Sequence, residues 1–159
     1  MNHPIIEQAT IEDLPRLTDF LTELFSFEED FVPDRPKQMR GLRLILEDPS
    51  RGRIFVLRHD GDIVGMINLL FTISTAEGGF VLLLEDLVIH RDYRHQGFGD
   101  QLLQYVFDYA TQKGFLRITL LTDRGIEESK LFFKKHGFIE SSMLPMRYYF
   151  SNHQPSNQS

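Results

Sequence analysis

The spacing of apolar residues predicts two helices in the first third of the chain, because helical core positions recur every three or four residues. A short strand over 5–9 is expected first, followed by a helix that Thr10 or Asp13 caps. Pro15 suits the start of this helix, and its apolar face comprises Leu14, Leu17, Leu21 and Leu24. Asp34 and Pro36 are expected to begin the second helix. Its buried residues are Met39, Leu42, Ile45 and Leu46.

The middle of the chain has the pattern of strands joined by tight turns. Asp60-Gly61 separates the segments RIFVLRH and DIVGMINLLF, which indicates a β-hairpin. Gly78-Gly79 then leads into an apolar strand over 80–89. A helix is expected after Gly99, ending at Gly114. Its buried positions are Leu102, Leu103, Val106, Phe107 and Ala110.

Shorter elements complete the chain. We expect a strand over 117–122, a helix over 129–136 capped by Gly137, and two final strands over 138–142 and 146–150. The resulting order, β-α-α-β-β-β-α-β-α-β-β, predicts a mixed α/β fold with a twisted central mixed sheet flanked by about four helices. A single domain would cover 1–150, and the polar remainder, 151–159, is expected to be disordered.

Composition narrows the classes of function. A net charge of −6 argues against non-specific nucleic-acid binding, which depends on neutralising phosphates. The longest apolar run is far shorter than the ~20 residues of a membrane span, and the first residues lack the pattern of a signal peptide. We therefore expect a cytoplasmic protein without a membrane partner. The absence of cysteine excludes disulfides, cysteine–metal sites and a thiol that carries an acyl group.

Candidate chemistry centres on the segment RDYRHQGFGD, residues 91–100. A strand, a glycine-containing turn and a helix direct several backbone N–H groups at one place, where they can hold a phosphate. Gly97 and Gly99 have no side chain to keep a ligand away from that backbone. A dinucleotide fingerprint would need a third glycine where Leu102 stands, and the Gly-Lys-Ser/Thr of a nucleotide P-loop is absent. These exclusions leave either another phosphate-bearing ligand or a helix start that uses its glycines only to make a tight corner.

Two motifs in this chain resemble those of the GNAT N-acetyltransferase superfamily. Arg94, Gly97 and Gly99 are similar to the R/Q-x-x-G-x-G/A signature, and LEDLVIHRDY resembles the strand and loop that precede it. Downstream, SKLFFKKHGF is similar to the later A-x-x-x-Y-x-K-x-G-F motif. The resemblance covers about 5–150. It implies transfer of an acetyl group from acetyl-CoA to an amine, with both substrates bound at once.

The same resemblance implies which residues bind the cofactor. Backbone groups of Leu87, Val88 and Ile89 would hold the pantetheine arm. Arg94, with Arg91 and His95, would add local positive charge beside the pyrophosphate. The amides that would hold the pyrophosphate belong to His95, Gln96, Gly97, Phe98, Gly99 and Asp100. Ser129 and Phe132 of the later motif would also contact acetyl-CoA, and Lys130, Lys134 and Lys135 either lie near its 3′-phosphate or form a solvated helix face.

Glu85 and Asp86 interrupt an apolar strand, where ionised carboxylates are costly unless they are satisfied. Adjacent strand positions face opposite sides, so only one is expected to point into a given cleft. The resemblance implies that Glu85 is a general base or holds the acceptor amine; Asp86 is expected to have a structural role. A carboxylate that accepts backbone hydrogen bonds at a sheet irregularity remains the alternative for Glu85.

The chain departs from the family pattern at the expected acid. Phe133 replaces the tyrosine that protonates the leaving thiolate, and Ile126 replaces an asparagine seven residues earlier. Solvent, Tyr148 or Tyr149 remain as proton sources, and strand packing is the alternative for both tyrosines.

The acceptor site of this fold involves the segment between the first two helices. An acidic rim formed by Glu28, Glu29 and Asp30 would attract a cationic amine, somewhat as in diamine and polyamine acetyltransferases, although a solvated loop explains it equally well. The leading hypothesis is a small-amine N-acetyltransferase. A protein or peptide lysine or N-terminal acetyltransferase, and a catalytically silent acetyl-CoA sensor, stay open. No metal is implied, and a homodimer is compatible with the resemblance.

Overall fold

The computed structural model describes residues 3–25, 33–122 and 127–150. The chain divides into two compact units, residues 1–120 and 121–159. The second unit contains the later motif and the C-terminal segment, and the first contains the sheet and three of the α-helices.

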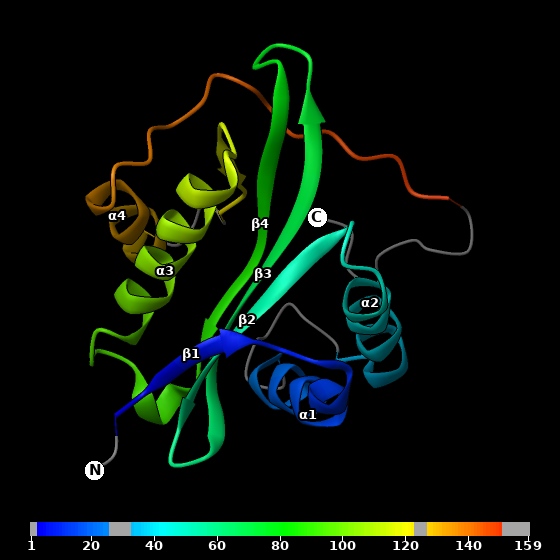
Figure 1. Ribbon diagram of the computed structural model, residues 1–159, viewed down its shortest axis with the longest axis vertical. Coiled ribbons are helices and arrows are strands. Elements are labelled where there is room, and N and C mark those ends of the chain that lie inside the picture. Colours follow the sequence, from blue (N-terminus) through cyan, green and yellow to red (C-terminus); the bar gives the residue numbers. More distant parts are fainter. Residues whose placement is uncertain (1–2, 26–32, 123–126, 151–159) are drawn as a thin grey trace. The chain divides into compact units, whose positions relative to one another are not determined.

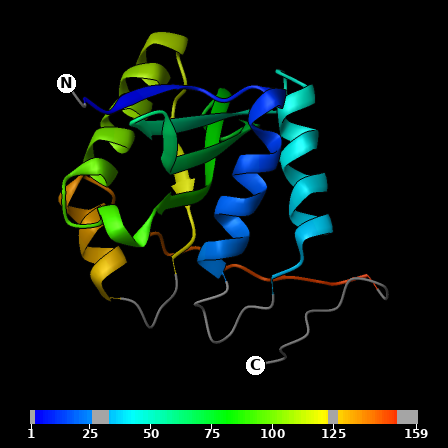
Figure 2. The ribbon, with the colours of Figure 1, turned by 90° about the horizontal axis from the view of Figure 1, so that it is seen from below.

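The first unit is built on one five-stranded sheet whose strand order follows the sequence, β1-β2-β3-β4-β5. Its strands are β1 (Ile5–Gln8), β2 (Gly52–His59), β3 (Asp62–Ser74), β4 (Gly79–Ile89) and β5 (Ile118–Leu120). The first four strands pair antiparallel, and β5 pairs parallel to β4. Helices α1 (Leu14–Phe25) and α2 (Arg35–Glu47) cover one face, and α3 (Phe98–Lys113) covers the other (Figures 1 and 2). The expected mixed α/β class is thereby confirmed.

The face beneath α1 and α2, called here the α1/α2 face, holds an apolar core. Leu14, Leu17 and Leu21 are buried there, as the helical spacing predicts, while the side chain of Leu24 lies outside the described residues. Both helix starts carry the expected caps: Thr10 N–H donates to Asp13 Oδ2 at 2.9 Å, and Asp34 Oδ1 accepts from Lys37 N–H at 3.2 Å. On α2, Leu42 is buried and Met39, Ile45 and Leu46 pack against the same core.

On the opposite face, α3 lies close to the sheet because Gly65 has no side chain. A Cβ at Gly65 would stand 2.8 Å from Ile89 Cδ1 and 3.2 Å from Leu102 Cδ1. Four of the five expected core positions of α3 are buried, and Phe107 is half-buried. The helix ends at Gly114, whose φ of 79° allows Phe115 N–H to bond back to Ala110 C=O at 2.9 Å.

Tight turns connect the strands where the sequence predicts them. Asp60 and Gly61 both have positive φ, 53° and 80°, which is the conformation of a type I′ hairpin turn. Gly78, with φ of 80°, turns the chain from β3 into β4. The predicted strand over 117–122 is shorter than expected, since β5 comprises only Ile118–Leu120.

The second unit contains α4 (Glu127–Lys135), which ends at Gly137 with φ of 95°. Phe138 N–H bonds to Phe133 C=O at 3.1 Å, and the two rings meet with centroids 5.5 Å apart, so the helix has the apolar contact typical of a glycine-terminated end. Lys130 and Lys134 both pair with Glu140, at 2.8 and 3.4 Å. Both of these lysines therefore form ion pairs within the second unit.

The two strands expected over 138–142 and 146–150 are wrong, since residues 138–150 form no strand. A strand requires a neighbouring strand that accepts its backbone hydrogen bonds, and an apolar pattern cannot supply one. The side chains of Ile139, Met146 and Tyr148 are accordingly 90%, 89% and 84% exposed. Strand packing therefore does not explain Tyr148 and Tyr149, and the element order ends at β-α-α-β-β-β-α-β-α.

Candidate active site

The sheet forks between β4 and β5. The two strands pair only over Leu82–Leu84 of β4, yet β4 continues to Ile89. On the β5 side, residues 86–89 therefore have no strand partner in the described part of the chain. The backbone of Leu87, Val88 and Ile89 lies along this open edge, as a strand that accepts an extended ligand requires.

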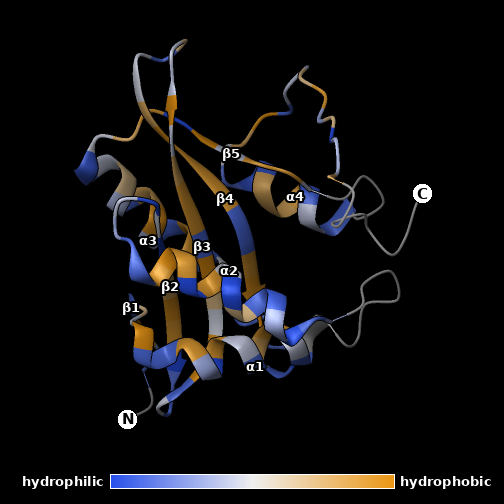
Figure 3. Ribbon diagram, turned by 90° about the vertical axis from the view of Figure 1, so that its right-hand side faces the viewer, coloured by the Kyte–Doolittle hydropathy of each residue, from blue (hydrophilic) through white to orange (hydrophobic). Residues whose placement is uncertain are grey.

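A β-bulge marks the start of the fork. Asn68 pairs with Asp86 and Leu69 pairs with Leu84, so Glu85 is the extra residue on β4. The strict alternation of sides that the sequence analysis assumes for Glu85 and Asp86 is interrupted by the bulge at that point. The polar interruption is visible within the otherwise hydrophobic β4 in Figure 3.

The two carboxylates differ in environment. Glu85 is exposed, and Asp86 is half-buried and accepts a hydrogen bond from Asn68 Nδ2 at 3.2 Å. Burial raises the pKa of Asp86, and the hydrogen bond from Asn68 opposes this shift only in part. The sequence prediction missed Asn68, although a buried polar residue within DIVGMINLLF was a detectable signal.

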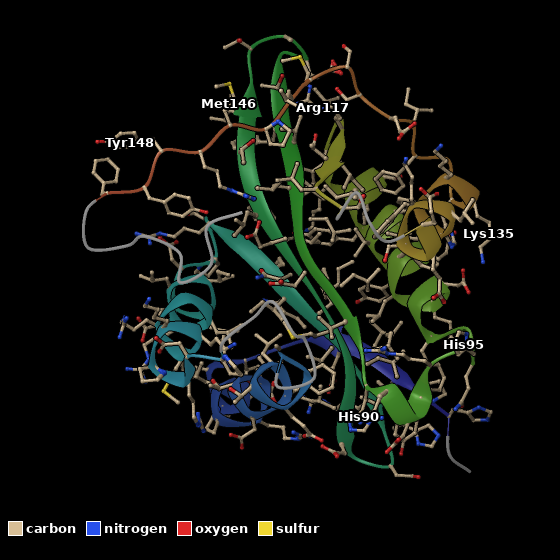
Figure 4. All side chains as sticks on the ribbon, turned by 180° about the vertical axis from the view of Figure 1, so that it is seen from behind. His90, His95, Arg117, Lys135, Met146 and Tyr148 are labelled. Atoms are coloured by element: carbon tan, nitrogen blue, oxygen red, sulfur yellow. The ribbon has the colours of Figure 1, made fainter. Side chains whose placement is uncertain are left out.

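The turn after β4 is organised by its own side chains. A short 3₁₀ segment, Arg91–Tyr93, follows His90, whose Nδ1 accepts from Asp92 N–H at 3.1 Å. Arg94 Nε donates to Ile89 C=O at 3.1 Å, and His95 has a positive φ of 64°. Figure 4 labels His90 and His95 on this segment. The backbone therefore makes a tight turn between the end of β4 and the start of α3.

The first turn of α3 presents the backbone donors that the sequence predicts. Gly97, with φ of 81°, precedes the helix, and the first helical hydrogen bond runs from Gln101 N–H to Gly97 C=O at 3.1 Å. The N–H groups of Phe98 and Gly99 come before that bond, at the end of the helix where backbone donors have no carbonyl partner within the helix. The positive end of the helix dipole lies at the same place, which suits an anion.

Aromatic residues that the sequence prediction did not single out support this turn. Tyr93 contacts His59, His90 and Phe98, with ring centroids 5.4, 5.9 and 6.3 Å apart. His90 also lies 3.4 Å from Glu23 Oε1 of α1. The turn is thus fixed from β2, α1 and α3 together, although these residues lie far apart in the sequence.

Several expected site residues lie outside the described part of the chain or belong to the second unit. Glu28, Glu29, Asp30 and Ile126 lie outside the described residues. Ser129, Phe132 and Phe133 belong to the second unit, where Phe132 contacts Phe133 and His136 with ring centroids 5.2 and 4.9 Å apart. Over the described ranges, no helix is long and apolar enough to cross a membrane.

The model of the Acetyltransferase (GNAT) family matches residues 14–138 of this chain. An amino-acid acetyltransferase of Pseudomonas putida is 29% identical over 139 residues, which is 87% of this chain and 28% of the relative. The chain therefore spans less than a third of the length of that curated relative.

Solved structures are similar to this chain in fold, although their sequence identity to it is low. A possible acetyltransferase from Clostridium difficile 630 superposes with a TM-score of 0.84 at 18% identity, covering 92% of this chain and 97% of the other. An aminoglycoside N-acetyltransferase in complex with CoA gives a TM-score of 0.78 at 18% identity, covering 94% and 96%. Together with the family match over most of the chain, the forked sheet and the turn before α3 lead to one conclusion: this protein belongs to the GNAT acetyltransferase family.

Proposed function

We propose that the protein is an acetyl-CoA-dependent N-acetyltransferase that moves the acetyl group to a small primary amine by direct attack in a ternary complex. One observation carries this proposal. Within one unit, the open edge of β4 leads through a short turn to the start of α3, where backbone N–H groups can act as donors. The aminoglycoside and amino-acid acetyltransferases among the similar proteins support an amine acceptor.

Acetyl-CoA matches this geometry in its charge and its shape. Its pyrophosphate suits the N–H groups at His95, Gln96 and Gly97 and at the first turn of α3, where the helix dipole favours an anion. Its pantetheine arm carries amides that can pair with the backbone of 87–89. Since a strand rises about 3.3 Å per residue, Glu85 lies about 13 Å from Ile89 along β4. An extended pantetheine arm covers that span, so the thioester would reach the fork.

Glu85 is proposed as the general base. An alkyl ammonium has a pKa near 10.4, so making it neutral at pH 7 costs roughly 4.6 kcal/mol. Glu85 stands at the bulge where the open edge begins and takes the proton directly or through water. The nitrogen lone pair then attacks the thioester carbon, the carbon–sulfur bond breaks to release CoA as a thiolate, and the nitrogen loses its second proton to solvent as the amide forms. Because the chain lacks cysteine, a thioester acyl-enzyme is excluded.

Protonation of the leaving group is the less demanding step. A thiol with a pKa near 8.5 leaves as thiolate at a cost of roughly 2 kcal/mol at pH 7, which is less than half the cost of the amine. Phe133 has no proton to donate, and solvent supplies one instead. The absence of the family tyrosine therefore lowers the rate without preventing the reaction.

Calorimetry with CoA, followed by thiol release from acetyl-CoA over a panel of polyamines, aminoglycosides, amino acids and peptides, tests the proposal. We expect binding of CoA and turnover with at least one small amine. Turnover on peptides alone would replace the small amine by a protein acceptor. Tight CoA binding without turnover on any acceptor would indicate a sensor, and no CoA binding would reject both the enzyme and the sensor.

A further inference from the structure

Asn68 and Asp86 lie on the same face of the sheet. Cross-strand partners share a face, and the row Ile54–Asn68–Asp86 crosses β2, β3 and β4. Next to it runs the row Val56–Met66–Val88, whose members pack in the core under α1 and α2. Asn68 and Asp86 are therefore on the α1/α2 face, opposite the face that α3 covers.

The Asn68 amide is only half satisfied. Asn68 is 5% exposed, and its Nδ2 donates to Asp86 Oδ2 at 3.2 Å. Its Oδ1 is buried and receives no hydrogen bond among the residues that the structure describes. The carboxylate fixes the orientation of the amide, because only the NH₂ group can donate to it. Leaving a buried acceptor without a donor is unfavourable, so this site favours a ligand that donates.

Resting on the proposed function, we propose that Asn68 Oδ1 and the Asp86 carboxylate form the pair that binds the primary ammonium of the acceptor. Both groups present acceptors, so the complementary ligand is positively charged and carries at least two N–H donors. A hydroxyl has one donor and no charge, and a carboxylate would be repelled. The pair follows directly after the bulge, so an ammonium bound there lies at the fork that the thioester would reach.

The two neighbouring carboxylates then have separate roles. Asp86 is half-buried and holds the ammonium, whereas Glu85 is exposed and accepts the proton before attack. A bound cation opposes the burial that raises the pKa of Asp86, so amine binding stabilises the ionised carboxylate. Recognition of the amine would thus rest on Asn68 and Asp86, which are fixed by the sheet, and would not require the acidic segment between α1 and α2.

Nuclear magnetic resonance on the full chain tests the pair without requiring turnover. The probe is ethylammonium, and the matched controls are tetramethylammonium, which has the same charge and no N–H donor, and ethanol. We expect ethylammonium to shift the Asn68 side-chain amide signals and the Asp86 carboxyl carbon in a saturable way, and the controls to leave them unchanged. No shift, or an equal shift with tetramethylammonium, would overturn the proposal.

Two variants separate this inference from the proposed function. With the best acceptor of the panel, Asp86→Asn and Asn68→Leu should each raise KM for the amine at least tenfold, while kcat changes less than threefold and CoA affinity is unchanged. Each variant should also abolish the ethylammonium shifts at the remaining partner. An unchanged KM in both variants would show that Asn68 and Asp86 do not bind the ammonium, and the proposed acetyltransferase activity would be unaffected by this result. If ethylammonium shifts these signals selectively but the protein transfers no acetyl group, the ammonium site would be supported and the proposed acetyltransferase activity would be rejected.

Discussion

The guanidinium of Arg94 donates from Nε to the backbone carbonyl of Ile89 at 3.1 Å, which ties the turn to the last residue of β4. In the sequence, Arg94 stands out as a source of positive charge beside the predicted pyrophosphate site. In the structure it also closes the five-residue loop that joins the strand to the donor-rich turn. We therefore expect Arg94 to support CoA binding in two ways, by holding the turn in position and by supplying positive charge.

Replacing Arg94 by lysine separates these two contributions, since lysine keeps the charge and lacks the planar Nε–H donor. We expect CoA affinity to fall about tenfold in Arg94→Lys, which corresponds to about 1.4 kcal/mol. Isothermal calorimetry measures this change, and Arg91→Lys on the same turn is the control with little effect. Full CoA affinity in Arg94→Lys would show that charge alone matters.

Gly97 is expected to serve the ligand as well as the backbone. Its φ is 81°, and a Cβ added there would have no heavy atom within 4 Å, so Gly97→Ala should cost only the left-handed strain of about 1–2 kcal/mol. Gly61→Ala, with φ of 80° and equally open space, is a matched control at the distant hairpin. Chemical unfolding should show similar losses in both variants. Only Gly97→Ala should weaken CoA binding; equal CoA affinity in the two variants would contradict the pyrophosphate site.

Glu85→Gln tests the proposed base. The variant should lower kcat most at pH values below the pKa of the amine, where the enzyme must remove a proton, and CoA affinity should stay nearly unchanged. The measurement is kcat against pH for wild type and variant with one amine. A pH profile of the same shape and height would exclude Glu85 as the base.

Asp86→Asn should stabilise the protein in a pH-dependent way. Because burial raises the pKa of Asp86 in the folded state above the unfolded value of about 3.9, folding favours its protonated form. Its contribution to stability is therefore fully present below the unfolded pKa and is lost as pH rises through the folded pKa. Asparagine avoids that loss and can still accept from Asn68, so the gain in unfolding free energy should grow over this window.

Urea unfolding at several pH values measures this gain, with Glu85→Gln as the exposed neighbour that removes the same charge. A gain that stays constant with pH, or one that is matched by Glu85→Gln, would show that burial of the Asp86 carboxylate does not carry a free-energy cost.

Phe133→Tyr restores the hydroxyl that the family motif usually carries. The Phe133 ring is half-buried and contacts Phe138 in the second unit, so tyrosine can keep this contact if its hydroxyl reaches solvent. Activity should be equal or higher, and the melting temperature should change little. A large loss of kcat with an unchanged melting temperature would show that an apolar ring shapes the site itself.

The features that depend on neighbours a few residues away can be predicted from the sequence alone. The caps at Asp13 and Asp34, the hairpin turn at Asp60-Gly61 and the glycine ends of α3 and α4 all lie where the sequence predicts them. The same holds for the GNAT motif before α3 and for the mixed α/β class. Each of these signals is local, because it rests on backbone conformation, on a short hydrogen bond or on helical spacing.

The pairing of the strands and their register, in contrast, are known only from the folded chain. The bulge that places Asp86 beside Asn68 joins residues 18 positions apart, and the fork depends on β5 ending opposite Leu84. The two C-terminal strands were predicted wrongly for the same reason. The residue pattern of 138–142 and 146–150 suits a strand, but these segments pair with no strand among the described residues. Strand pairing is a contact between distant segments, and no local property of either segment specifies where the partner begins or ends.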